Sequence, residues 1–532
     1  MSDSDRAGQY DLFCAGPQPA REHKAHGVAN QRVFVAPARD ELYLNMTPLG
    51  THLRETGLRA PFVVAELLDR QDWSEFEQRY SSAGRAPFAP RCMMGIILYG
   101  IMQGVSSLRA LERFARVDLG CMWVSGGIKP DHAVLGRFIR LHEASLTSSF
   151  FEQLTAAVLR AGGGGVEQLA GDGTVVEAAC SHYRLLHEEA LQQQLERARE
   201  HSERAPDHPD HAERLEQAQR CSEHYEQRKQ ARKNKGRSSA SLQISPTEPE
   251  AMVQPLKRKR GYAPSYKPTV LANDQRVITA FHVDPGNEGA ALQSMLTQSA
   301  RLGQAQIEQL SLDSGFFNAE TLQWAVQRGL NLLCPPPQAI PGRRRRDRKY
   351  FAKFDFHYEA EHDRYRCPAG AYLYPVERAR ASARKRAYTR YSSHACLECP
   401  WRKRCTPGRK RRIDRYDGDE EKDAMRMVMN QPRARARYRR HQGQVEPVFS
   451  ALRLQQGLER FRRRHLAGVR VEFALHALAH NLSRAVALLW LAFCALYRPL
   501  SRFMSLWVAV ESIHHATVVS AGLNPGQAMS AS

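Results

Sequence analysis

The sequence predicts an α/β protein: a mixed-sheet core with a helical N-terminal domain, a helical-hairpin insertion and a cysteine-bearing insertion. Two observations predict this architecture. Hydrophobic residues recur at helical spacing over residues 51–160, whereas from residue 261 short β-type runs alternate with helical ones, as in α/β sheets. A basic stretch with four cysteines then interrupts the alternation over residues 343–412. A chain of 532 residues has room for about three domains.

Residues 1–50 are mixed and polar, and we expect them to form a flexible N-terminal segment. Residues 51–160 should form a helical domain. Pro90 stands near the start of an apolar helix, where proline is favoured. Ser106 or Ser107 can then cap the next helix through its side-chain oxygen.

A further helix of this domain follows a break at two glycines, and Asp131 can cap it. Its apolar residues form one stripe, which leaves Arg137 and Arg140 facing outward. Helix, turn and helix with exposed arginines is typical of a unit that docks on DNA. An ordinary helical bundle explains this segment equally well.

The α/β core is predicted from three separated stretches, residues 161–182, 260–342 and 413–497. Its β-type segments are VEQLA, TVLAND, RVITAFHV and IEQLSLD, with turn residues between them. Helical segments are expected at residues 289–302, 318–329, 420–440 and 446–495. An apolar run near the end of the last segment is too short to span a bilayer, so a buried helix is expected there, before a tail over residues 498–532.

Residues 183–259 are predicted to be a charged helical arm inserted into the core. Two helical segments flank the breaker APDHPDH, which is typical of a hairpin or a coiled-coil arm. Such an arm suits DNA or a partner chain better than catalysis. His201, His208 and His211 could bind a metal ion, but a solvated linker is the favoured interpretation.

The net charge of the chain indicates which class of partner it binds. The chain carries 77 Lys and Arg against 56 Asp and Glu, a net charge of +21. An excess of this size favours association with a polyanion. Each basic run alone is typical of a solvated face, but several runs in the C-terminal half favour a nucleic-acid groove over an acidic membrane surface. These runs are Arg343 to Arg346, Arg402 to Arg412, Arg433 to Arg440 and Arg460 to Arg464.

The N-terminus has no basic region followed by an apolar one, so export is not expected. The 11 cysteines are an odd number in a chain expected to remain inside the cell, and a disulfide framework is therefore not predicted.

Three carboxylates are the candidate catalytic residues. Asp313 ends the strand-like run IEQLSL and precedes a turn, the place where ligands bind in α/β sheets. Asp172 lies between Gly171 and Gly173, whose small size lets a phosphate approach. Glu446 precedes a proline, and we therefore expect it at or just before the start of a helix.

Taken alone, each acid is most often a turn residue or a cap, and spacing does not exclude three rival acids, Glu177, Asp284 and Glu472. If Asp172, Asp313 and Glu446 meet, their oxygens suit hard cations. Two Mg²⁺ ions, with Mn²⁺ as a substitute, could then activate an attacking oxygen and stabilise the leaving one in phosphodiester chemistry. The nucleophile would be water first and a DNA 3′-hydroxyl second.

Arg453 lies seven residues after Glu446, about two helical turns, and so on nearly the same face. It could hold a phosphate beside the acids. A plain surface arginine is the alternative.

Several motifs in a fixed order carry a family resemblance. They are DGT at Asp172, DSGF at Asp313, YRRHQGQVEPVFSALR around Glu446, the early helical segment PRCMMGIILYGIMQG, and the middle segment SPTEPEAMVQPLKRKRGYAPSY. With them the chain, over about residues 60–495, resembles a DDE-type transposase of a bacterial insertion sequence. The resemblance implies an RNase H-like catalytic core, a helical N-terminal domain, and a metal-binding triad at the three acids.

The resemblance also implies contacts with the ends of the element. In the family's tyrosine-arginine-glutamate-lysine pattern, Tyr438 and Glu446 fit, whereas Arg453 stands where lysine is usual and His441 where arginine is expected. Arg439 or Arg440 can take that role. The implied DNA-binding residues are Tyr438, Arg439, Arg440, Arg453, Arg137 and Arg140.

The implied activity is strand cleavage and strand transfer on DNA, with terminal inverted repeats and target DNA as partners. A homodimer assembled on DNA, in the nucleoid region of the bacterial cytoplasm and not on a membrane, is expected. Two alternatives remain: a metal-dependent nuclease of the same fold that does not join strands, and a non-catalytic DNA-binding protein derived from a transposase.

The basic insertion contains Cys367, Cys396, Cys399 and Cys405. A C-x₂-C pair is a usual half of a structural zinc site. The other two cysteines come from opposite sides of this pair, which is unusual for a second half. Two interpretations of these cysteines remain: a structural Zn²⁺ site, and reduced thiols packed in a small β subdomain.

Overall fold

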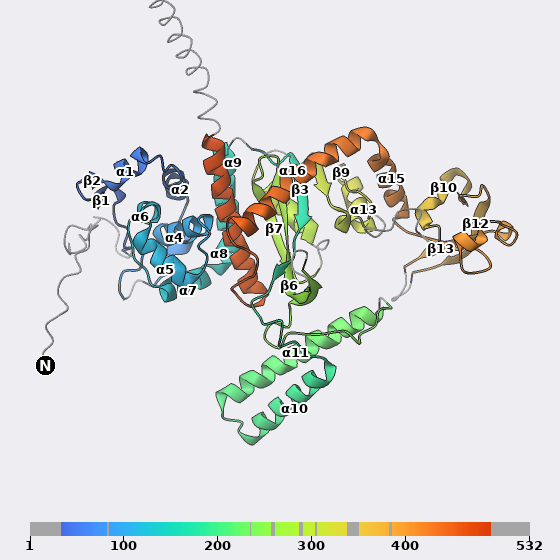
Figure 1. The fold of residues 1–532 in the computed structure, drawn as a ribbon, viewed down its shortest axis with the longest axis horizontal. Helices are drawn as coiled ribbons and strands as arrows, with labels where there is room; N and C mark the ends of the chain where they lie inside the picture. Colours follow the sequence, from blue (N-terminus) through green and yellow to red (C-terminus); the bar gives the residue numbers. More distant parts are fainter. Residues whose placement is uncertain are drawn as a thin grey trace, which may run out of the picture.

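A computed structural model describes residues 33–490 apart from 82–83, 163, 235, 257–260, 287–290, 304–305, 338–349 and 382–385. Figure 1 shows a central sheet with helices on one side, a small second sheet on the other, and a two-helix arm that projects from the base. The chain is thus a mixed α/β protein with a helical N-terminal region. The expected tail, residues 498–532, and the basic run at residues 343–346 lie outside the described residues.

Helices make up the N-terminal region, as expected. They are α1 (Leu49–Glu55), α2 (Ala60–Asp69), α3 (Ser74–Glu77), α4 (Pro90–Met102), α5 (Leu108–Val117), α6 (Leu119–Ser125), α7 (His132–Leu141), α8 (Glu143–Thr147) and α9 (Ser149–Gly162). Ser107 and Asp131 cap α5 and α7 through their side chains. The helix α6 was not expected, and it lies between the two helices of the predicted helix-turn-helix.

The expectation of a flexible segment over residues 1–50 is wrong for its last part. Residues 33–50 contain a 3-10 helix η1 (Arg39–Glu41) and the hairpin strands β1 (Tyr43–Leu44) and β2 (Thr47–Pro48), and α1 begins at Leu49. The segment is held because Leu42 packs on a cluster that includes buried Leu49 and Trp123. Residues 1–32 lie outside the described residues.

The central sheet is mixed. Its strands are β3 (Gln168–Gly173), β4 (Val176–Glu177), β5 (Met252–Pro255), β6 (Tyr262–Asn273), β7 (Ile278–Asp284), β8 (Gln309–Leu312) and β9 (Asn331–Leu333). The strand β6 pairs antiparallel with β7 and β3, and β3 pairs parallel with β8, which pairs parallel with β9. The helices α12 (Leu292–Ala300) and α13 (Ala319–Gln327) lie in the connections before and after β8.

Two further helices close the core. The helix α15 (Asp419–Asn430) is followed by α16 (Pro432–Leu454), which packs against β3, β6 and β8. A last described helix covers residues 465–490. Its Phe473 meets Phe281 of β7 with ring centroids 5.6 Å apart, and the side-chain amide of Asn481 exchanges hydrogen bonds with the main chain of Ile278.

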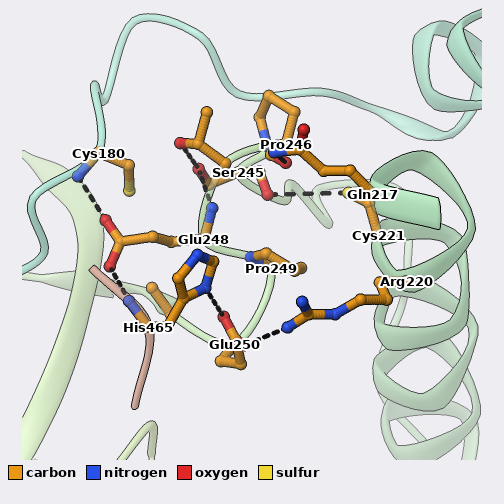
Figure 2. A network of polar contacts seen from close by, with 12 residues as sticks. Cys180, Gln217, Arg220, Cys221, Ser245, Pro246, Glu248, Pro249, Glu250 and His465 are labelled. Atoms are coloured by element: carbon orange, nitrogen blue, oxygen red, sulfur yellow. Dashed lines mark hydrogen bonds and ion pairs between the residues drawn. The ribbon is translucent and has the colours of Figure 1, made fainter. Parts of the chain in front are cut away.

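The arm consists of α10 (Glu188–Arg204) and α11 (Pro209–Asn234), a helical hairpin as predicted. A small buried cluster around Leu191, Cys221 and Tyr225 holds the pair together. At its base, buried Glu248 and half-buried Glu250 link the arm to the core through polar contacts, which Figure 2 shows.

The cysteine-bearing insertion forms its own antiparallel sheet, in the order β10 (His357–Glu359), β11 (Arg364–Arg366), β12 (Tyr372–Ala379), β13 (Tyr388–Ser392) and β14 (Ile413–Tyr416). The predicted boundary at residue 412 is therefore too early, because β14 pairs with β13 and belongs to this sheet. The nine cysteines within the described residues are free thiols. None of the described helices is long and apolar enough to cross a membrane.

Candidate functional site

Strand register places Asp172 and Asp313 side by side. In the parallel pair β3 and β8, Gly171 is the partner of Leu312. Asp172 and Asp313 each follow directly, at the same level on neighbouring strands, which lie about 4.8 Å apart in a sheet. The backbone of Asp313 is still extended, with φ −76° and ψ 173°. Since residues at the same level of parallel strands share a face, both carboxylates lie at the carboxyl end of the sheet on the same face.

The main chain fixes both aspartates. The Oδ1 atom of Asp172 accepts a hydrogen bond from the N–H of Gly173 at 2.7 Å. The Oδ1 atom of Asp313 accepts one from the N–H of Gly315 at 2.9 Å. The tight turn after β8 supplies the second contact, because Asp313 caps the short helix η3 (Ser314–Phe316).

Glu446 comes from α16, which crosses this end of the sheet. The expectation that Glu446 opens a helix is wrong: α16 runs from Pro432 to Leu454 and contains Pro447 in its interior. Proline lacks the N–H that would bond the carbonyl four residues earlier, here that of Gly443. The Nε of Arg276 donates to that carbonyl at 3.2 Å, so the helix passes through the proline without an orphaned acceptor.

Asp172 and Glu446 line one open cavity of about 900 Å³. Asp313 is not among the residues that line it. Side chains of α16, of the β6–β7 turn and of the last helix complete the wall. The polar lining residues are Asp172, Thr174, Arg276, Glu446, Ser450, Arg453, Gln455, His480, Ser483 and Arg484.

The charges of all three acids affect the pKa of Tyr438 on α16. Burial raises the pKa of its phenol well above the ordinary value, and the charges of Asp313, Asp172 and Glu446 raise it further. Its ring stacks on His441, with centroids 5.1 Å apart. Burial lowers the pKa of His441, which keeps the imidazole neutral at neutral pH.

Arg453 is turned into the cavity. Its Nη2 donates to the hydroxyl of Thr174 and to the carbonyl of Val175, the latter at 3.4 Å. These contacts tie α16 to the loop after β3, beside Asp172. The interpretation of Arg453 as a plain surface residue is therefore wrong.

The other candidates are placed as follows. Arg439 and Arg440 of α16 are exposed, as are Arg137 and Arg140 of α7. Among the rival acids, buried Glu472 accepts main-chain hydrogen bonds from Arg462 and Arg463. Glu177 forms an isolated β-bridge with Arg460. Asp284 ends β7, and its Oδ1 accepts a hydrogen bond from the N–H of Gly286. Each rival has a local structural role away from the cavity.

Sequence reasoning missed most of the polar side chains of the cavity, among them Thr174, Arg276, His480 and Arg484. Three of these four are single residues in a turn and a helix, outside the basic runs. Thr174 could have been found, because it is the third residue of the DGT motif.

The four cysteines of the insertion, Cys367, Cys396, Cys399 and Cys405, line one small, apolar cavity of about 20 Å³. Burial raises the pKa of the Cys405 thiol, and the nearby Arg411 charge opposes this, while the other three thiols add to it. The hairpin turn of the arm brings His208 and His211 together, with ring centroids 4.5 Å apart, and His201 stacks beside them.

Within the described residues, no group of three or more His, Cys, Asp or Glu side chains is placed so that it could hold a metal ion. For the acids there is a physical reason. Three carboxylates without a cation repel one another, and Asp172 and Asp313 each turn one oxygen to a neighbouring main-chain N–H.

Two family models match this chain. The first, described as "Transposase DDE domain", matches residues 366–486, which include Tyr438, Glu446 and Arg453 but neither Asp172 nor Asp313. The second, described as "Transposase domain (DUF772)", matches residues 61–141, from α2 to α7. No curated protein matches the chain.

Both matches describe transposase domains, in separate parts of the chain, and together they support a DDE-type transposase of an insertion element.

Proposed function

We propose that this transposase catalyses metal-dependent strand cleavage and strand transfer of its insertion sequence, with Asp172, Asp313 and Glu446 as the catalytic triad. The observation that carries the proposal is the register of β3 and β8, which sets the two aspartates at one level. The packing of α16 across that end of the sheet then brings Glu446 into the cavity of Asp172. The mixed sheet, three antiparallel strands followed by two parallel ones, supports an RNase H-like core.

The donor set fits Mg²⁺, or Mn²⁺ in its place. Carboxylate oxygens are the ligands that these hard cations prefer, and the cavity is open to solvent waters. Asp172, Asp313 and Glu446 would hold two such ions, which supply activation of an attacking oxygen and stabilisation of a leaving one when bound.

The chain's own residues position the DNA. Arg453, held at the loop after β3 by Thr174 and Val175, would bind a phosphate oxygen of the strand beside the acids. Tyr438 keeps its proton because of burial and the acids, so its hydroxyl can donate to DNA. Exposed Arg439 and Arg440 on the same helix would contact the backbone of the element end.

Terminal inverted repeats and target DNA are the proposed partners, in the nucleoid region of the bacterial cytoplasm. The exposed Arg137 and Arg140 of α7 would dock on the repeats. Because two ends of an element must be cut and joined, we propose a homodimer assembled on DNA.

Structural Zn²⁺ in the insertion is proposed as well. Four thiols in one apolar cavity are a suitable donor set. Burial and the other three thiols raise the pKa of Cys405, and a divalent cation would stabilise its thiolate. Metal analysis of the purified chain should give about one Zn²⁺ per chain, lost in Cys399→Ser. A metal-free wild-type chain that keeps its folded insertion would refute this.

The function is tested with a duplex that carries the element's terminal repeat, in Mg²⁺. Asp313→Asn should abolish cleavage and spare end binding, whereas Asp284→Asn, a change of the same chemistry at a rival acid, should keep both. Retained cleavage in Asp313→Asn would mean that the wrong acid was assigned.

The same system separates the alternatives. Pre-cleaved ends offered with target DNA should give joined product; cleavage without joining would instead define a nuclease. End binding with no cleavage in any divalent cation would define a non-catalytic DNA-binding protein.

A further inference from the structure

The cavity that holds Asp172 and Glu446 also contains two arginines from segments distant in sequence. Arg276 lies in the turn between β6 and β7, and Arg484 lies on the last described helix, residues 465–490. Neither belongs to a basic run. Each uses its Nε on a main-chain carbonyl: Arg276 on Gly443 at 3.2 Å, and Arg484 on Gln275 at 2.9 Å.

The turn that carries Arg276 is rigidly held. Arg276 itself has a left-handed backbone with φ +63°, which is uncommon for a residue with a side chain. The carbonyl of Arg276 accepts a hydrogen bond from His480 at 2.9 Å, and Asn273 closes the turn by accepting from Val277. A strained conformation held by several contacts is typical of a functional position.

Within the described part of the chain, neither Arg276 nor Arg484 makes an ion pair, and the charge of Arg276, after burial, lowers the pKa of Arg484. Like charges that face one cavity are unfavourable unless an anion lies between them. Because the Nη1 and Nη2 groups make no hydrogen bond within the described residues, their N–H donors remain for a ligand.

We propose that Arg276 and Arg484 together bind one backbone phosphate of the DNA strand, next to the phosphate that is cut. This inference rests on the proposed function, since it places a phosphodiester strand in the same cavity. Asp172, Glu446 and the two arginines all line this one cavity, so a strand that enters it can meet both the acids and the arginine pair. Planar guanidinium groups bind phosphate oxygens in pairs, which fixes the strand's direction.

Binding measurements test the pair without catalysis. The full-length Asp313→Asn chain is titrated with the terminal-repeat duplex at several salt concentrations, alone and combined with Arg276→Gln and Arg484→Gln. Loss of one phosphate contact should lower the slope of log K against log salt by about 0.9, which is about eightfold in affinity at ~0.1 M salt. The lysine variants, which keep the charge, should recover most of the slope.

Arg301→Gln is the matched control, since Arg301 is an exposed arginine that pairs with Glu152 at 3.4 Å and does not line the cavity. It should leave affinity and slope unchanged. Thermal unfolding of each variant checks that the turn still folds, because a purely structural role would lower stability and leave the slope intact.

Neutral methylphosphonates, placed at one phosphate position at a time, locate the contact. A methylphosphonate at one position beside the cleavage point should weaken DNA binding by the parent chain. The same methylphosphonate should not further weaken DNA binding by the chain that carries both Arg276→Gln and Arg484→Gln. Equal penalties in both chains at every position would overturn the proposal. The proposed function fails separately: if the wild-type chain never cleaves in Mg²⁺ but the coupling is present, the phosphate site stands and the catalytic assignment falls.

Discussion

Replacing Glu248 with alanine should loosen the junction between the arm and the core. Glu248 is fully buried. It accepts hydrogen bonds from the N–H of Cys180 at 2.6 Å, the N–H of His465 at 3.2 Å and the hydroxyl of Tyr266 at 3.3 Å. These donors come from the segment after β4, the start of the last helix and β6, so one carboxylate joins three parts of the chain. Figure 2 shows the contacts of Glu248 with Cys180 and His465.

The magnitude follows from the donors left behind. Each buried donor without an acceptor costs about 1–3 kcal/mol, so three donors give about 3–9 kcal/mol of local stability. Glu250 is the matched control in the same loop. It pairs with Arg220 at 2.8 Å and His465 at 3.4 Å, both partly exposed partners, so Glu250→Ala should cost under about 1 kcal/mol.

Amide hydrogen exchange is the suitable assay, because a chain with several domains has no single free energy of unfolding. Exchange at Cys180 and His465 should accelerate strongly in Glu248→Ala and little in Glu250→Ala. If both variants accelerate these amides equally, the buried carboxylate is not what holds the junction.

Three further predictions concern the site and its support. Gly171→Ala should lower both stability, by about 1–3 kcal/mol, and cleavage, since its Cβ would meet Leu312 Cδ2 at 2.6 Å and Leu271 Cδ2 at 2.8 Å; Gly443→Ala, where nothing lies within 4 Å, is the control, and equal stability of the two would refute the packing argument. Arg453→Lys should retain more cleavage than Arg453→Ala, because lysine keeps the charge beside Thr174; equal loss would show that the guanidinium geometry is required. Burial lowers the pKa of His480 from 6.5 to about 4, so the unfolded chain binds a proton that the folded chain does not, and stability should fall as pH drops from about 6.5 towards 4, by at most about 1.4 kcal/mol per pH unit; thermal unfolding of His480→Gln against pH should show a shallower fall, and an unchanged profile would refute it.

Much of the core could be predicted because its strands are short apolar runs between turn residues. The segments of β3, β6, β7 and β8 were expected, and with them the position of Asp313 at a strand end. Glu446 was misplaced because the rule that proline starts a helix ignores tertiary partners. Arg276 donates to the carbonyl of Gly443 the hydrogen bond that Pro447, which has no N–H, cannot donate, and this contact is invisible in the sequence.

The C-terminal edge of the insertion and the two arginines of the cavity were missed because both depend on tertiary contacts. Residues 413–416 join the insertion's sheet only through pairing with β13, which no local pattern reveals. Arg276 and Arg484 come together across more than 200 residues of sequence. The basic runs gave no sign of these two arginines, because each is a single charge on a separate element.

The layout of charge in the cavity explains why acids and arginines occur together in it. Asp172 and Glu446 offer carboxylate oxygens that suit cations, and Arg276 with Arg484 suits an anion, since neither arginine makes an ion pair within the described residues. A phosphodiester strand with divalent cations satisfies both sets at once, since its phosphates meet the arginines and the cations meet the acids. Either ligand alone leaves one set unbalanced, so DNA and metal should each strengthen the binding of the other. The anchoring of the β6–β7 turn to α16 through Arg276 and Gly443 keeps the two sets at a fixed separation, which is what positioning a strand for cleavage requires.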